Sequence, residues 1–203
     1  MNKKNIFILI AICIVAVTFI TIIGLGLKGK TTDEEHVLEF LGEIKGYTSN
    51  VTIEIENDRG KNVYKAQQKY ARNIGSKLEF QDGRTYLFKG GDIEVKDNHS
   101  GKEYTMDENL DEVLRYSFVS EYTGLLYINE ELNFDTETVG DERYFIITTV
   151  IPGSNINMCK GSLYYSVDEH LPKKIIIYDN KGNTRVSYTY DNFKLMDSAE
   201  VEF

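Results

Sequence analysis

Histidine is the side chain in this sequence best suited to metal binding or proton transfer, and the chain holds three, His36, His99 and His170. They lie far apart, outside any HExxH motif, and no cysteine cluster accompanies them, so the ligands of a tetrahedral metal site are missing. His36 falls on a predicted helix and the other two in predicted turns, where an exposed imidazole is the ordinary finding. The histidines therefore predict neither a metal site nor a bound cofactor.

Two further patterns have the residue types of a hydrolase. The run Asp-Glu-His at 168–170 looks like a catalytic cluster, but neighbours in a turn point apart and no nucleophile motif such as GxSxG is present. Carboxylate pairs like those of glycosidases occur at Glu130 and Glu131 and at Asp141 and Glu142, all at element ends or turns. An acidic chain contains such pairs by chance. We therefore predict no catalytic residues.

Phosphate binding is disfavoured both by glycine placement and by charge. Gly90 and Gly91 join two predicted strands instead of opening a helix, so their amides gain no helix N-terminus. All 32 acidic residues follow residue 30, but only 19 of the 23 basic residues do, which gives this part a net charge of −13. That charge repels nucleic acid and anionic lipids, and it either favours a basic or zwitterionic partner or simply keeps the domain soluble. We expect no nucleic-acid binding.

The first thirty residues differ in composition from the rest of the chain. Residues 6–27 are apolar apart from threonines and small residues, and a helix of this length extends about 33 Å, enough to cross a bilayer core. Lys3 and Lys4 precede the run, and no evident cleavage site follows it. The sequence thus predicts an uncleaved signal anchor over 1–30 and one domain over 31–203, held on the extracytoplasmic side of the cell membrane.

The two cysteines lie in different predicted environments, so we expect no disulfide between Cys13 and Cys159. Cys13 is a candidate for lipidation, because bacterial lipoproteins carry their modified cysteine directly after the apolar core of the signal. Here Ile12 stands where a small residue is required, and the apolar run continues beyond Cys13. We interpret Cys13 as an ordinary thiol of a membrane helix, with lipidation as the alternative.

The positions of these residues depend on two predicted helices. Over 107–131, apolar residues recur at steps of three and four, which predicts a helix with one apolar face. Thr105 and Glu108 have the spacing of a capping box, and Gly124 offers a place for the helix to break or bend before residues 125–128. A shorter amphipathic helix is predicted over 32–43, ended by Gly46. We expect both helices to cover a sheet.

Everything else alternates between strand patterns and turn sequences. About six strands precede the segment 107–131 and about five follow it, joined by short turns that indicate antiparallel neighbours. Residues 144–151 (YFIITTVI) and 174–178 (KIIIY) are apolar on both sides, which predicts cover on both faces. The predicted fold is mainly β with α: a curved antiparallel sheet or unclosed barrel of about eleven strands, plugged by helices and followed by a loose tail over 197–203.

Aromatic residues are unusually distributed, with 14 tyrosines, 10 phenylalanines and no tryptophan. Many fall on predicted strands: Tyr86, Phe88, Tyr144, Phe145, Tyr164, Tyr165, Tyr188 and Tyr190. Ordinary core packing accounts for most of them. The functional alternative is a hydrophobic groove between sheet and helix that takes an acyl chain or the side chains of a partner.

Several short runs in order resemble the germination lipoprotein GerS and its relatives in spore-forming Clostridia, over about residues 33–194. They are NDRGKNVYKAQQKY, YLFKGGDIEVKD, EYTGLLYINEE, VIPGSN and IIIYDNKGNTRVSYTYDNF. The layout also resembles the lipoprotein-carrier fold of LolA, LolB and RseB-type sensors. The resemblance implies a non-enzymatic envelope protein of sporulating cells, associated with a cortex-modifying N-acetylmuramoyl-alanine amidase, and it transfers no active-site residues. Without a lipobox at Cys13, a spanning anchor would replace the lipid.

Three functional hypotheses follow from these observations. The first is a membrane-tethered, non-enzymatic binding or scaffold module for a protein partner, a cell-wall amidase by resemblance. The second is a carrier or sensor of a lipid or other hydrophobic ligand, held in the groove between sheet and helices. The third, a hydrolase, has the least support, because no catalytic constellation accompanies the carboxylates.

Overall fold

The structure, a computed structural model, describes residues 33–203. The predicted anchor over 6–27 and the candidate lipidation site Cys13 lie outside the described residues. Within the described range, no helix combines the length and the apolar character needed to cross a membrane. Residues 37–203 form one compact unit, and the fold is described for this unit.

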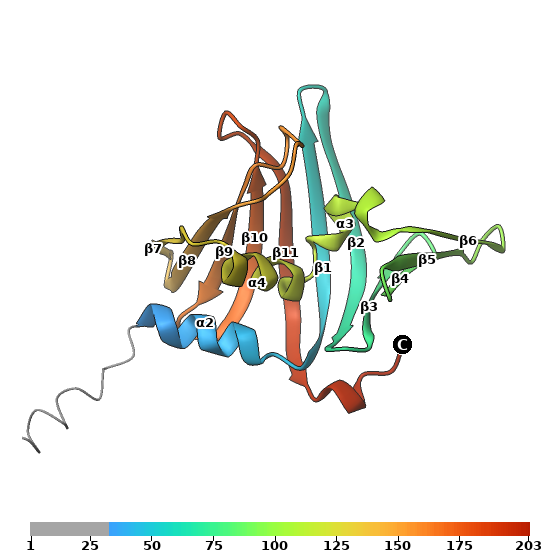
Figure 1. Cartoon of the computed structure of the whole chain (residues 1–203), viewed down its shortest axis with the longest axis horizontal. Coiled ribbons are helices and arrows are strands. Elements are labelled where there is room, and N and C mark those ends of the chain that lie inside the picture. The colour runs from blue at the N-terminus through green and yellow to red at the C-terminus, as the bar shows by residue number, and fades with distance from the viewer. Residues whose placement is uncertain (1–32) are drawn as a thin grey trace, which may run out of the picture. The chain divides into compact units, whose positions relative to one another are not determined.

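Eleven antiparallel strands form one sheet, in the order β6-β5-β4-β3-β2-β1-β11-β10-β9-β8-β7. β1 pairs with both β2 and β11, so the sheet consists of two meanders that meet at its centre. Figure 1 shows β6 and β7 at opposite ends of the sheet. The strands are β1 Gly46–Asn57, β2 Gly60–Ala71, β3 Gly75–Phe80, β4 Arg84–Lys89, β5 Asp92–Asp97, β6 Lys102–Asp107, β7 Asn133–Val139, β8 Glu142–Val150, β9 Lys160–Ser166, β10 Leu171–Tyr178 and β11 Thr184–Met196. The predicted unclosed antiparallel sheet of about eleven strands is confirmed.

Helical segments lie on one face of this sheet, which we call the inner face (Figure 1). They are α2 Asp33–Glu43, the 3-10 turn η1 Glu108–Leu110, α3 Glu112–Arg115 and α4 Val119–Ile128, with a second 3-10 turn, η2 Ser198–Glu200, near the end of the chain. Val37 and Leu41 of α2 are buried in the core, as are Tyr122 and Leu126 of α4. Each large apolar side chain removed from water in this way stabilises the fold by about 1.5–3 kcal/mol.

The continuous helix predicted over 107–131 is wrong, because the segment is divided into three pieces. Asp107 and Asp111 each accept a hydrogen bond from a backbone amide two or three residues on, so each caps a new helical segment. The predicted capping box at Thr105 is therefore replaced by aspartate caps. The bend predicted at Gly124 falls inside α4, and the break comes earlier, at Phe118, whose backbone is extended with φ −84° and ψ 127°.

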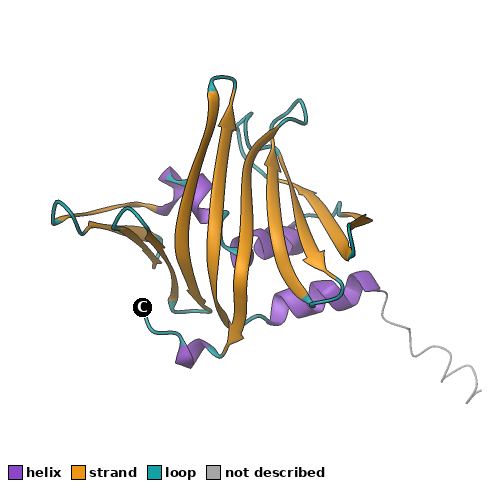
Figure 2. Cartoon of the chain, turned by 180° about the vertical axis from the view of Figure 1, so that it is seen from behind, coloured by secondary structure: helices purple, strands orange, loops and turns teal. Residues whose placement is uncertain are grey.

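The strands predicted to need cover on both faces are covered on one. In β8, Phe145 and Ile147 on the inner face are buried, whereas Tyr144 and Ile146 on the opposite face are half-buried. β10 repeats the pattern. Figure 2 shows this opposite face, which we call the outer face, with the strands toward the viewer and α4 behind them. The prediction is wrong because no helix covers the outer face. Branched and aromatic side chains of neighbouring strands contact one another there and so remain half-buried.

The segment predicted as a loose tail, 197–203, packs against the start of β1. The hydroxyl of Ser198 donates a hydrogen bond of 2.7 Å to the carbonyl of Lys45, and Val201 is 7% exposed. A Cβ at Gly46 would lie 3.0 Å from Val201 Cγ2 and 3.1 Å from a carbonyl oxygen, so the close packing favours glycine here. Gly46 thus opens β1, shortly after the last turn of α2, which ends at Glu43.

Candidate binding surfaces

The histidines considered as metal ligands are exposed and lie on separate elements. His36 lies on α2, His99 in the β5–β6 turn and His170 in the β9–β10 turn, where its backbone has a φ of 55°. Within residues 33–203, no group of three or more His, Cys, Asp or Glu side chains is placed to hold a metal ion. Gly90 and Gly91 form the β4–β5 turn, both with positive φ, as expected for a hairpin.

The run Asp-Glu-His at 168–170 is exposed, and its two carboxylates form ion pairs on the surface of the sheet. Asp168 accepts hydrogen bonds from the backbone amide and the guanidinium of Arg143, both at 3.2 Å, and these bonds lower the pKa of Asp168. Glu169 pairs with Lys173 at 2.5 Å. Of the carboxylate pairs, Glu142 accepts a hydrogen bond from the hydroxyl of Tyr144, and none of the four members is buried. None of these contacts aligns a nucleophile with a base.

The eight strand aromatics singled out by the sequence divide between the two faces. Six of them are buried on the inner face: Tyr86, Phe88, Phe145, Tyr165, Tyr188 and Tyr190. Tyr144 and Tyr164 are half-buried on the outer face, where they lie on neighbouring strands. Sequence composition does not separate these two groups, because strand alternation assigns faces only when the covered face is known.

Tyrosine hydroxyls attach the inner face to the break between α3 and α4. Tyr188 donates a hydrogen bond of 2.6 Å to the carbonyl of Val113, and Tyr190 donates one of 2.8 Å to the carbonyl of Ser117. The hydroxyl of Tyr47 accepts the amide of Val119 at 3.0 Å. We call Tyr47, Tyr188 and Tyr190 the tyrosine latch.

The latch provides hydrogen-bond partners for backbone groups at the interruption of the helix. Backbone groups at a helix end lack intrahelical partners, and a buried unsatisfied group costs about 1–3 kcal/mol. Gln68 adds a further hydrogen bond of 2.9 Å to the carbonyl of Ser117. Burial raises the pKa of all three latch tyrosines well above the ordinary value, so their hydroxyls stay protonated. Tyr188 and Tyr190 need that proton in order to donate their bonds.

The inner face around the latch is filled by the chain itself. Tyr47, Tyr122 and Tyr188 are 0% exposed and Tyr190 is 2% exposed. Tyr122 of α4 also donates a hydrogen bond of 3.1 Å to the carbonyl of Ile147 in β8. An acyl chain at these residues would have to displace α4 and break its hydrogen bonds, so the predicted groove is occupied here by the helix.

Six apolar side chains lie on the outer face of three neighbouring strands, and we call them the outer patch: Tyr144, Ile146 and Val150 of β8, Tyr164 of β9, and Ile176 and Tyr178 of β10. The register places Thr148, Ser162 and Lys160 among them on the same face. Ile146 lies directly opposite Tyr164 in the ladder, and the rings of Tyr144 and Tyr164 meet edge to face with centroids 6.1 Å apart. Lys160 lies 5.6 Å from the ring centroid of Tyr178. Five members are half-buried and Val150 is 55% exposed, so this mainly apolar surface faces solvent.

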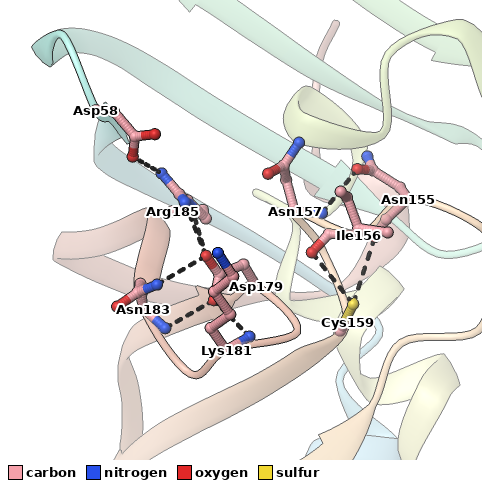
Figure 3. A network of polar contacts seen from close by, with 9 residues as sticks. All are labelled: Asp58, Asn155, Ile156, Asn157, Cys159, Asp179, Lys181, Asn183 and Arg185. Atoms are coloured by element: carbon pink, nitrogen blue, oxygen red, sulfur yellow. Dashed lines mark hydrogen bonds and ion pairs between the residues drawn. The ribbon is translucent and has the colours of Figure 1, made fainter.

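A polar cluster at one end of the sheet ties two turns together (Figure 3). Asp179, which is 5% exposed, accepts hydrogen bonds from the amide of Asn183 at 2.8 Å and from Nε of Arg185 at 2.9 Å. Arg185 also reaches Asp58 in the β1–β2 turn at 3.1 Å. The bonds from Asn183, with those from Lys181 and Arg185, hold the pKa of Asp179 far below its ordinary range. Because these donors are engaged within the chain, the cluster stabilises the turns.

Cys159 lies beside this cluster in the loop between β8 and β9 (Figure 3). Its thiol donates weak hydrogen bonds to the carbonyls of Asn155 and Ile156, at 3.5 and 3.4 Å. The backbone amide of Cys159 donates to Tyr178, and the amide of Asn180 donates to Ile156. The loop is therefore fixed to the end of β10, and Cys159 acts as a packing residue there.

Comparisons with known proteins identify a family and several solved structures that are similar to this chain. The profile of a family described as "Sporulation protein YdcC-like" matches residues 3–203. No curated protein sequence matches the chain. A solved chain described as an uncharacterized conserved protein from Thermus thermophilus is similar with a TM-score of 0.53 and 10% identity, covering 82% of this chain and 89% of that one.

A second solved structure is that of the CwlD amidase from Clostridioides difficile in complex with the GerS lipoprotein. The match has a TM-score of 0.50 and 22% identity, and it covers 83% of this chain and 99% of that one. A LolA superfamily protein, NE2245 of Nitrosomonas europaea, is similar with a TM-score of 0.40 and 17% identity over 80% of this chain and 93% of that one. The fold expected from the sequence resemblance to GerS is thereby confirmed.

Proposed function

The chain belongs to the YdcC-like family of sporulation proteins, and from this premise we propose that it is a non-enzymatic scaffold that binds a protein partner in the envelope of the sporulating cell. The observation that carries the proposal is the contrast between the two faces of β8–β10. Over these strands the inner face is closed by α4, whose Tyr122 donates a hydrogen bond to the carbonyl of Ile147 in β8. The tyrosine latch of β1 and β11 fixes the segment that leads into α4. The outer patch keeps apolar side chains half-exposed, as a protein-binding surface requires.

The proposed partner is a cell-wall amidase of the N-acetylmuramoyl-alanine type. Support comes from the solved complex of GerS with the CwlD amidase, which contains a chain of similar fold. In this proposal the amidase supplies the chemistry and the present chain supplies a surface. A domain without a metal-ligand group or nucleophile constellation among residues 33–203 suits that division of roles.

The proposed location is the extracytoplasmic side of the membrane, with residues 6–27 as a single-pass anchor. Tethering fixes the domain within reach of the cell wall and suits a scaffold better than a shuttle. Lipidation at Cys13 is the alternative form of attachment. Mass spectrometry of the protein purified from sporulating cells distinguishes the two, because a lipid adds its mass to an N-terminal peptide.

The test is direct binding between two purified proteins. The full chain in detergent is immobilised and exposed to the CwlD-type amidase of the same organism in biolayer interferometry. We expect saturable binding with a Kd of about 1 μM or tighter. The chain alone, incubated with cortex peptidoglycan, is expected to release no products. Absence of binding, or hydrolysis by the chain alone, would contradict the proposal.

A further inference from the structure

We infer that the outer patch and the acidic edge of β7 together form the docking surface for one kind of partner: a protein segment with apolar side chains at its centre and lysines or arginines along one border. This inference rests on the proposed function and specifies the chemistry of the contact. It combines three observations, namely the size of the patch, the unpaired carboxylates beside it and the net charge of the domain.

The outer patch and the β7 edge together have the extent of a docking site. The patch lies on three strands and β7 is the fourth; strands lie about 4.8 Å apart and rise about 3.3 Å per residue, so these four strands with seven residues each cover about 20 Å by 23 Å. That area is more than half of the roughly 800 Å² that each partner contributes to a standard interface. Tyrosine rings form much of this surface, and tyrosine is enriched at interface hot spots. In Figure 2 this face of the sheet lies toward the viewer, with α4 behind it.

Two carboxylates border the patch along the edge strand β7. Asp135 lies opposite Ile146 and Glu137 lies opposite Tyr144 in the β7–β8 ladder, so both belong to the outer face. Both are exposed, and neither forms an ion pair with any residue in the range 33–203. Burial is the largest cause that raises the pKa of Tyr164 to about 12, Tyr178 is the next, and the charges of Glu137 and Asp135 add smaller contributions. These carboxylates are therefore close to the patch and free to pair with a partner.

Positive charge lies on the β9 and β10 side of the patch. Lys160 lies between Val150 and Tyr178 in the ladder and over the ring of Tyr178, and Lys174 lies opposite Tyr164 in the β9–β10 ladder. A partner therefore fits in one orientation, with its cations over β7 and its neutral or acidic side over β10. Charge arranged in this way fixes orientation and accelerates association.

The net charge of the domain favours a basic protein segment over a second copy of the chain or a lipid surface as the occupant of the outer patch. The part of the chain after residue 30 carries a charge of −13, which repels a second copy of the chain and anionic lipid headgroups alike. Each of these would also bring further negative charge to Asp135 and Glu137. A segment with lysines or arginines instead gains two ion pairs at the rim of an apolar contact.

The test compares two double charge reversals in the full chain, measured against the CwlD-type amidase by biolayer interferometry. Asp135→Lys with Glu137→Lys changes the β7 edge. Asp92→Lys with Glu94→Lys makes the same change of charge, at the same spacing, on the outer face of β5. We expect the first variant to slow association about 10-fold or more and to lose its dependence on salt, and the second to change association less than about 2-fold.

A second pair of variants tests the apolar centre. Tyr164→Ser is expected to weaken binding about 30-fold, mainly through faster dissociation, as for a tyrosine hot spot. Tyr104→Ser removes a tyrosine that is 54% exposed on β6, at the other end of the sheet, and should leave binding unchanged. Circular dichroism of each variant confirms that the fold is kept.

The outcomes separate the two proposals. If the unchanged chain binds the amidase but the β7 and Tyr164 variants bind equally well, this inference is overturned and the proposed function stands. If the unchanged chain does not bind, both are overturned. With the full chain inserted in vesicles through residues 6–27 and no amidase present, slower hydrogen exchange in β8–β10 on phosphatidylglycerol than on neutral vesicles would identify a lipid surface as the occupant and also overturn the inference.

Discussion

The two faces of β8–β10 are built from similar residues and differ in what covers them. Ile175 and Ile176 are adjacent in β10, yet Ile175 is 0% exposed under α4 and Ile176 is half-buried on the outer face. Tyr165 and Tyr164 of β9 make the same comparison for tyrosine, because Tyr165 is buried and Tyr164 is half-buried. Aromatic and branched residues in this sheet therefore mark a binding surface only where the chain supplies no helix of its own.

The largest effect expected from this comparison concerns the adjacent isoleucines. Ile175→Ala leaves a cavity between the sheet and the helices, and we expect a loss of about 2–5 kcal/mol in the free energy of unfolding. Ile176→Ala removes a side chain already in contact with water, and we expect a loss of about 1 kcal/mol or less. Urea unfolding followed by circular dichroism measures both, and equal losses would mean that the faces are covered alike.

A second prediction concerns the tyrosine latch. Tyr188→Phe keeps the ring but leaves the carbonyl of Val113 without its hydrogen bond, so we expect a loss of about 1–3 kcal/mol in the free energy of unfolding. Faster hydrogen exchange in α3 should accompany the loss, because Val113 belongs to that helix. Tyr104→Phe on β6 is the control and should change neither quantity. Unchanged exchange in α3 would show that helix packing alone holds the segment.

A third prediction concerns the polar cluster around Asp179, which lies at one end of the sheet and not on either face. The pKa of Asp179 is lowered in the folded state, mainly by Asn183, so its contribution to stability is present above the unfolded pKa of about 4 and is lost as pH falls through the folded value. Asp179→Asn should therefore be less stable than the unchanged chain at neutral pH, and the difference should shrink in acid. Asp58→Asn alters a residue whose side chain is 92% exposed and should have little effect. Urea unfolding at several pH values measures both.

The smallest effect is spectroscopic. The pKa of Tyr144 is raised to about 12 by its hydrogen bond to Glu142, and that of Tyr164 to about 12 mainly by burial. Glu142→Gln should lower the pKa of Tyr144 and leave that of Tyr164 higher. Phenolate absorbance during a titration from about pH 8 to about pH 13, which brackets the ordinary tyrosine value, measures this change.

The same titration separates the two faces. Latch tyrosines should ionise only on unfolding, because burial raises their pKa well above the ordinary value. Since they ionise near pH 10 in the unfolded chain, stability should fall as pH rises above about that value. Ionisation of all tyrosines in one step, without loss of structure, would contradict the division of the sheet into a closed and an open face.

Local patterns in the sequence were sufficient for the strands. Two-residue alternation and turns such as Gly90 with Gly91 depend on neighbours a few residues away, and they predicted the count, the antiparallel order and the open edges. The resemblance to GerS, carried by several short runs, predicted the fold that the structural comparison confirms.

The errors arose where distant residues decide the outcome. Helical spacing over 107–131 could not reveal a break held by Tyr47 and Tyr190, which lie on strands far away in the chain. The tail packs through Val201 against the start of β1, again a distant contact. Double cover for β8 and β10 was inferred from apolar content, which does not say whether a second layer exists. The outer patch was missed for the same reason, although the parity of Tyr144 and Ile146 was visible in the sequence.

The seam between β1 and β11 has a consequence for how the protein is made. Val51 pairs with Tyr190, so the centre of the sheet joins the beginning of the domain to its last strand. Until β11 has left the ribosome, β1 keeps an unpaired edge and Tyr47 lacks Phe193, against which its ring stacks. Folding thus finishes late and through contacts of long sequence separation, so the chain is most exposed to aggregation and proteolysis in the interval before β11 pairs with β1.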